Sequence, residues 1–115
     1  MSKQFALHAT AIRPLAPNRG GCIAPDTITV DGRKVGFCYR EAPHNELDSG
    51  WRFFAGDETD DYLAVTDNSA VYDVNTIANY DPEIIPLLDA PVGAAFERGE
   101  GLGPLAPVYD FELPA

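Results

Sequence analysis

The run Asp48-Ser-Gly-Trp-Arg-Phe-Phe-Ala-Gly-Asp-Glu-Thr-Asp-Asp61 decides the fold that the sequence predicts. Residues 48–50 favour a turn, because glycine supplies positive φ and Asp or Ser bonds its own nearby backbone. The aromatic residues within 51–54 are typical of a pleated, half-buried strand. The only tryptophan of the chain, Trp51, lies in this strand, so we expect the strand to form the centre of the core. It runs directly into the most acidic loop, residues 57–61.

Size and composition indicate one small soluble domain. A chain of 115 residues is in the usual range for a single hydrophobic core. Ten prolines and ten glycines favour short elements joined by many turns. No window approaches the roughly 20 apolar residues of a membrane span, and the N-terminus lacks the apolar stretch of a signal peptide. We therefore expect a cytoplasmic protein without a membrane partner.

The charge is strongly negative and unevenly distributed. The formal net charge is -10 and the pI is near 4.3. Residues 1–40 carry six basic and two acidic side chains, whereas residues 41–115 carry two basic and sixteen acidic ones. Such a field repels nucleic acid and anionic membranes and attracts basic partners. The alternative reading of this charge is solubility alone.

Several short strands are predicted from local patterns. An Asp-Gly pair between the β-type runs 27–30 and 34–39 predicts a hairpin. Residues 70–74 and 94–96 are predicted as two further strands. The class that follows is α+β, a single domain with a mostly antiparallel sheet of three to five strands and one or two short helices.

Two short helical segments are predicted in the second half of the chain. Residues 75–80 form a helical turn with Asn75 as its cap. Asp81 and the proline after it predict a helix start, and a second proline limits this helix to a short or kinked element over 82–88. The polar side chains Asn75, Asn79 and Tyr80 are either a hydrogen-bonding contact surface or caps of turn ends, and capping is favoured.

The chain divides into three segments. Residues 1–21 are an N-terminal extension or an edge strand, because apolar residues alternate loosely near the start. Residues 22–98 carry the predicted domain. Residues 99–115 are a Gly/Pro-rich tail that Val108, Tyr109 and Phe111 dock onto the body.

The acidic loop does not predict a metal site. If Asp57 is placed at position 1 of an EF-hand loop and Asp61 at position 5, the invariant glycine is replaced by Tyr62. The bidentate glutamate of position 12 is replaced by Asn68. We therefore predict no metal and no cofactor.

Catalytic patterns are likewise missing from the sequence. His44 with Glu46 and Asp48 is the one conceivable His–carboxylate pair, and a histidine in a polar loop is more often solvated than catalytic. Cys22 and Cys38 have neither redox nor zinc spacing, so buried reduced thiols are expected. No catalytic residue is predicted, and the protein is not expected to be an enzyme.

Four segments together resemble the bacterial immunity protein 33 family, formerly a domain-of-unknown-function family of polymorphic toxin systems. The resemblance covers about residues 22–98. The segments are Lys34-Val-Gly-Phe-Cys-Tyr-Arg-Glu41, Asp48-Ser-Gly-Trp-Arg-Phe-Phe-Ala-Gly-Asp-Glu58, Tyr72-Asp-Val-Asn-Thr-Ile-Ala-Asn-Tyr-Asp-Pro-Glu-Ile-Ile-Pro-Leu-Leu-Asp-Ala-Pro91 and Gly93-Ala-Ala-Phe-Glu-Arg98. The resemblance implies an α+β fold and a cytoplasmic antidote that binds and neutralises a cognate bacterial toxin.

The acidic surface suits such a role, because an acidic protein can occupy the basic cleft of a toxin that acts on nucleic acid. Aromatic residues and arginine commonly anchor interfaces of this kind. The toxin-binding candidates are Trp51, Arg52, Asp57, Glu58, Asp60, Asp61 and Tyr62. The alternatives are a solvated loop beside a core tryptophan and a small ligand-binding or regulatory domain without a toxin partner. A carboxylate-dependent enzyme comes third.

Overall fold

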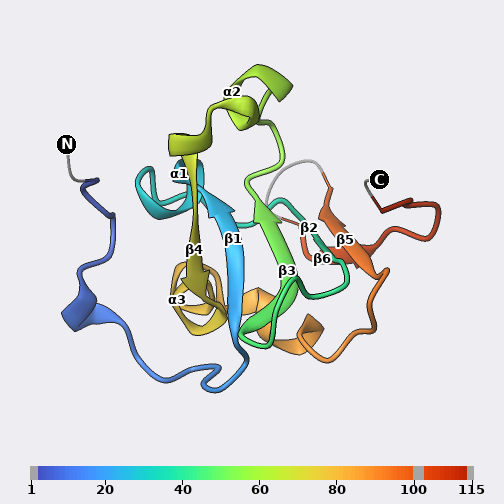
Figure 1. The fold of residues 1–115 in the computed structure, drawn as a ribbon, viewed down its shortest axis with the longest axis horizontal. Coiled ribbons are helices and arrows are strands. Elements are labelled where there is room, and N and C mark those ends of the chain that lie inside the picture. Colours follow the sequence, from blue (N-terminus) through green and yellow to red (C-terminus); the bar gives the residue numbers. More distant parts are fainter. Residues whose placement is uncertain (1–2, 100–102, 114–115) are drawn as a thin grey trace.

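The computed structural model describes residues 3–99 and 103–113, and in these residues six strands form one mixed sheet (Figure 1). The strand order is β4-β1-β3-β2-β5-β6, with β1 and β3 parallel and the other neighbours antiparallel. The strands are β1 (Gly21–Pro25), β2 (Phe37–Arg40), β3 (Asp48–Phe54), β4 (Ser69–Asp73), β5 (Ala95–Arg98) and β6 (Leu105–Pro107). The helical segments are α1 (Asp26–Thr29), α2 (Asp60–Ala64) and α3 (Val74–Tyr80), with 3₁₀ turns η1 (Ala9–Ala11), η2 (Thr66–Asn68) and η3 (Pro82–Leu87).

The predicted α+β class and the mostly antiparallel sheet are confirmed. The strands predicted over 70–74 and 94–96 are present as β4 and β5. The predicted range of three to five strands is too low, because two strands were not predicted: β1, and β6 in the described part of the tail, which pairs with β5.

The core lies on one face of the sheet, under α1, α3 and η3. Trp51 of β3 is 1% exposed, and its ring stacks on that of Phe53 with centroids 5.8 Å apart. The indole N–H of Trp51 donates to the carbonyl oxygen of Leu88 at 3.4 Å, which satisfies its one polar group. The strand predicted around Trp51 is therefore the central strand of the core.

Residues 48–50 belong to β3, which corrects the prediction of a turn before the strand. The parallel register of β1 and β3 shifts between Gly21 and Ile23, so β3 carries extra residues here. Gly50 takes them up as a bulge with φ +89°. A Cβ at Gly50 would lie 2.1 Å from the carbonyl oxygen of Glu41, so this position requires glycine.

The predicted hairpin across the Asp-Gly pair is wrong. Most of the run 27–30 lies in the helical turn α1, and β2 starts only at Phe37. Gly32 has φ +77°, and its N–H donates to the carbonyl oxygen of Ile28 at 3.0 Å, as is common after the end of a helix. An Asp-Gly pair is compatible both with a hairpin turn and with the end of a helix. Burial of Ile28 in the core under α3 favours the helix.

Both helical segments predicted in the second half of the chain are present. The turn over 75–80 is α3, but its N-cap is Asp73 in place of the predicted Asn75. The short helix over 82–88 is η3, which begins as predicted with Asp81 as the N-cap and a proline after it. Among the helices of the described residues, none has the length and apolar character to cross a membrane.

The N-terminal arm, residues 3–20, forms no strand, so of the two alternatives predicted for residues 1–21 the extension describes the arm and the edge strand does not. It contains the turn η1 and otherwise runs along the side of the domain to the start of β1 (Figure 1). The backbone N–H of Ala6 donates to the carbonyl oxygen of Thr29 at 2.8 Å, which places the arm beside α1.

The C-terminal segment 103–113 docks through two of the three predicted residues. The N–H of Val108 donates to the carbonyl oxygen of Ala95 at 2.8 Å. The ring of Phe111 packs on Tyr39 of β2 with centroids 5.1 Å apart, on the sheet face opposite the core. Tyr109 is 93% exposed, so its predicted docking role is wrong.

Truncation of the core tryptophan is expected to destabilise the protein strongly. Trp51→Ala should lower the free energy of unfolding by about 3–5 kcal/mol, because it leaves a large cavity in the packed core. Chemical denaturation monitored by circular dichroism measures this loss. Tyr109→Ala removes an exposed aromatic ring and serves as the control, with an expected change within about 0.5 kcal/mol. Equal midpoints for the two variants would contradict the placement of Trp51.

Candidate functional site

The acidic loop predicted from the sequence leads into α2 at one end of the sheet (Figure 1). Thr59 is the N-cap of α2, and its hydroxyl accepts the N–H of Tyr62 at 3.1 Å. Asp60 and Asp61 follow in the first turn, and both are exposed. These two carboxylates are therefore presented to solvent by a short, capped helix.

Glu58 holds the loop in place. Its Oε2 accepts the Thr27 hydroxyl at 2.6 Å and the N–H of Ala55 at 2.8 Å. Its Oε1 accepts the N–H of Gly56 at 2.8 Å. Burial alone would raise the pKa of Glu58, but these hydrogen bonds outweigh burial and the pKa is lowered. Glu58 thus ties the loop to α1.

The other loop residues lie among further acidic side chains. Asp57 pairs with Arg33 at 2.6 Å, and that hydrogen bond lowers the pKa of Asp57. Tyr62 is half-buried, and its pKa is raised by burial and by the charges of Asp26 and Asp31. We call this surface the acidic end, and its members are Asp26, Asp31, Asp57, Glu58, Asp60, Asp61 and Asp67.

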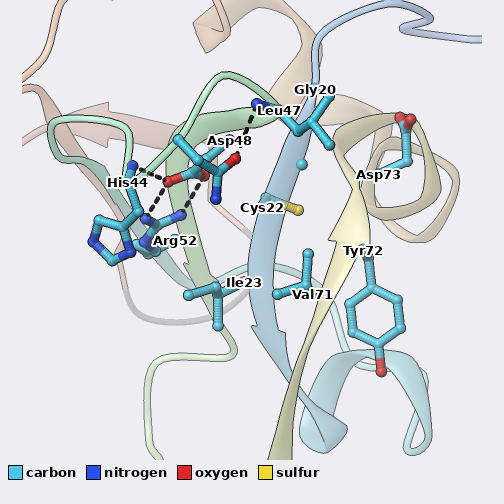
Figure 2. Close-up of a pocket in the computed structure, with 12 residues that line it drawn as sticks. Gly20, Cys22, Ile23, His44, Leu47, Asp48, Arg52, Val71, Tyr72 and Asp73 are labelled. Carbon is cyan, nitrogen blue, oxygen red and sulfur yellow. Dashed lines mark hydrogen bonds and ion pairs between the residues drawn. The ribbon is translucent and has the colours of Figure 1, made fainter.

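Trp51 and Arg52, the other two candidates, offer no surface to a partner. Trp51 lies in the core, and the side chain of Arg52 is 2% exposed. The Arg52 guanidinium donates to Glu41 at 2.5 Å. It also donates to the two carboxylate oxygens of Asp48 at 2.9 and 2.8 Å (Figure 2). This contact holds the pKa of Asp48 well below its usual range. Arg52 is thus part of the framework.

A second surface, which we call the groove, lies on the sheet face opposite the core and has a volume of about 480 Å³ (Figure 2). Two large apolar side chains on it are exposed, Leu47 at 81% and Val71 at 74%. The side chains of Ile23 and Val71, on the neighbouring strands β1 and β4, project from the same face of the sheet (Figure 2). The groove is lined by Gly20, Gly21, Ile23, Leu47, Arg52 and Val71.

No local pattern in the sequence predicts the groove. The one local indication is Leu47, an isolated apolar residue in the polar connection before β3. Its position in the groove beside β1 and β4 depends on the tertiary fold.

Asn75, Asn79 and Tyr80 have a role that neither predicted alternative describes: they bind the N-terminal arm. The amide oxygen of Asn75 accepts two consecutive N–H groups of the arm, and the Asn79 oxygen and the Tyr80 hydroxyl accept one each. The donors are Leu15 and Ala16 at 2.8 Å for Asn75, Arg13 at 2.9 Å for Asn79 and Leu7 at 3.1 Å for Tyr80. Helix α3 thus acts as the anchor of the arm.

The histidine and the cysteines singled out in the sequence lie in different environments. His44 is exposed, and its Nε2 lies 3.5 Å from the Glu41 carboxylate, while Asp48 accepts the backbone N–H of His44. Cys22 and Cys38 are free and buried, and burial raises the pKa of both thiols, that of Cys38 to about 12. Within 3–99 and 103–113, no group of three His, Cys, Asp or Glu side chains could hold a metal ion.

Comparison with protein families finds a match for most of the chain. The model described as "Immunity protein Imm33 domain" matches residues 22–106 of the 115-residue chain. The matched region contains all strands of the sheet except the first residue of β1 and the last residue of β6. It also contains the acidic end and most of the groove. The comparisons with curated proteins and with solved structures gave no match.

Acid should weaken the fold through Asp48. Because its folded pKa lies below that of the unfolded chain, Asp48 stabilises the protein above pH about 4, and this contribution is lost as the pH falls below that value. Asp48→Asn keeps the shape but removes one charged partner of Arg52, at a cost of about 1.5–3 kcal/mol at pH 7. Denaturation midpoints between pH 7 and pH 3 should fall less steeply in Asp48→Asn than in the natural protein. Parallel profiles would show that the ion pair contributes nothing to acid sensitivity.

Proposed function

The chain belongs to the Imm33 immunity protein family, and we propose that it binds and neutralises a cognate bacterial toxin through its acidic end. The family match over residues 22–106 is the observation that carries the immunity role. The acidic end as the contact surface is our inference from charge and exposure. We further propose that the protein acts by binding rather than by catalysis, and in the cytoplasm.

The charges of the acidic end are not equally available to a partner. Two cations lie among them, Lys3 paired with Asp26 at 2.7 Å and Arg33 paired with Asp57. Glu58 is engaged by backbone N–H groups. Asp60 and Asp61 are exposed on α2 and supply the strongest charge that a partner would meet.

A basic toxin cleft is the surface that this end would fit. Toxins directed at nucleic acid bind phosphates through Lys and Arg side chains. Carboxylates on a rigid support can occupy the same positions and exclude the substrate. A net charge of -10 would also speed the encounter with a basic partner, which favours capture before damage occurs.

Neutralising the exposed pair should slow toxin capture. In Asp60→Asn/Asp61→Asn, association with the cognate toxin should slow by roughly tenfold at low salt. The difference should shrink at about 0.5 M salt, where the Debye length is only a few ångströms. Stopped-flow binding measures both rates, and a melting curve should show little change in stability.

The matched control is Asp110→Asn/Glu112→Gln, which removes the same charge from exposed positions of the C-terminal segment. If association with the toxin slows equally in both double variants, the rate depends only on net charge and the acidic end is not the contact surface. Unchanged rates in Asp60→Asn/Asp61→Asn lead to the same conclusion and leave the immunity role standing. Failure of the natural protein to bind or inhibit the toxin would refute the proposed function itself.

A further inference from the structure

The two edges of the sheet differ in how well they resist pairing with another strand. The β6 edge contains Pro107 and follows Pro104, and proline lacks the N–H that strand pairing needs. The β4 edge, with the sequence Ser-Ala-Val-Tyr-Asp, contains no proline and no lysine. In the sheet order β4 has only β1 as a neighbour. The β4 edge is therefore the one suited to accept a further strand.

The pairing of β4 with β1 shows which backbone groups face outward. The N–H of Val74 donates to the carbonyl oxygen of Gly20 at 2.9 Å, so position 74 points toward β1. Gly21 points away from β4, because its N–H donates to Leu47 on the β3 side at 2.6 Å. N–H and C=O directions alternate along a strand. Val71 therefore presents both its N–H and its C=O along the outer edge.

The side chains next to this edge are apolar and exposed. Val71 lies at the middle of β4 with most of its surface open to solvent, and Ile23 is its partner on β1. Leu47 stands across the groove from them (Figure 2). A strand added beside β4 would place alternate side chains on this same face, against Val71 and the groove.

The charges around β4 define the chemistry of that strand. Asp67 precedes β4 and Asp73 ends it, and both are exposed. The one cation of the groove, Arg52, is already paired with Asp48 and Glu41. A segment with an apolar centre and basic ends would therefore match the edge. A second copy of this chain would instead bring another net charge of -10.

We propose that the outer edge of β4 binds an extended segment of the toxin as an additional strand, with an apolar centre over Val71 and Lys or Arg near Asp67 and Asp73. This inference rests on the proposed function, because it takes the toxin as the partner. Strand addition supplies affinity through main-chain hydrogen bonds and specificity through alternate side chains. Because β4 follows directly from η2 at the acidic end, a toxin bound there reaches this edge as well.

The test uses the full chain and an inactivated form of the cognate toxin. Val71→Pro removes the outward N–H but none of the bonds from β4 to β1, and Val71→Lys keeps the N–H but adds a repelling charge. Each should weaken toxin binding by roughly tenfold or more. Val92→Lys, at an exposed loop position, is the matched control and should bind normally. In the complex, hydrogen exchange of the Val71 amide should slow by roughly tenfold or more.

The outcomes separate this inference from the proposed function. If the natural protein binds the toxin, but both Val71 variants bind equally well and the Val71 amide exchanges freely, the β4 edge is not the site and the immunity role stands. If the natural protein does not bind, both proposals fail. If sedimentation shows that the natural protein is a dimer and that Val71→Pro is a monomer, the edge binds a second copy of the chain and the inference is overturned. If Val71→Pro has a lower melting temperature than the natural protein, toxin binding by Val71→Lys is the test of the inference.

Discussion

The ion pairs of Arg52 with Asp48 and Glu41 hold the region of the sheet on which the other elements depend. They join the bulged start of β3 to its middle and to the loop before it. Since β3 lies between β1 and β2, its register sets which residues of both neighbours face the core. A buried guanidinium without its carboxylate partners would lower the stability of the fold strongly, so alternative registers of β3 that separate them are disfavoured. The bulge at Gly50 and the buried Trp51 are fixed by the same contact.

The acidic residues of this chain serve two separate purposes. Asp48 and Glu58 have lowered pKa values because they accept hydrogen bonds inside the fold, and they stabilise the strand start and the loop. Asp60 and Asp61 lie on the surface of the same loop region. A net charge of -10 therefore overstates the charge that a partner meets as freely accessible side chains. If Asp60 and Asp61 contact the toxin as proposed, this division allows binding and stability to be altered independently.

The sequence predicted the elements whose signals are local. The aromatic strand at Trp51 and the start of η3 at Asp81 both depend on neighbouring residues, and both are present. The Asp-Gly pair was misassigned because it suits a hairpin or a helix end, and burial of Ile28 decides between them. The exposed carboxylates Asp60 and Asp61 were identified from the local run of acidic residues 57–61. Arg52 was predicted on the surface, since arginine is usually exposed, and its burial depends on partners that only the fold supplies.

The attachment of the N-terminal arm to α3 has a consequence for synthesis on the ribosome. The groups that bind the arm follow it by 59 to 73 residues in the chain. The arm is therefore made first but can dock only after α3 has emerged and folded. Until then its apolar residues, Leu7 and Ala16 among them, remain available to other nascent chains or to chaperones. The arm is thus made before strands β1 to β4 but reaches its native place only after α3, which follows them in the chain.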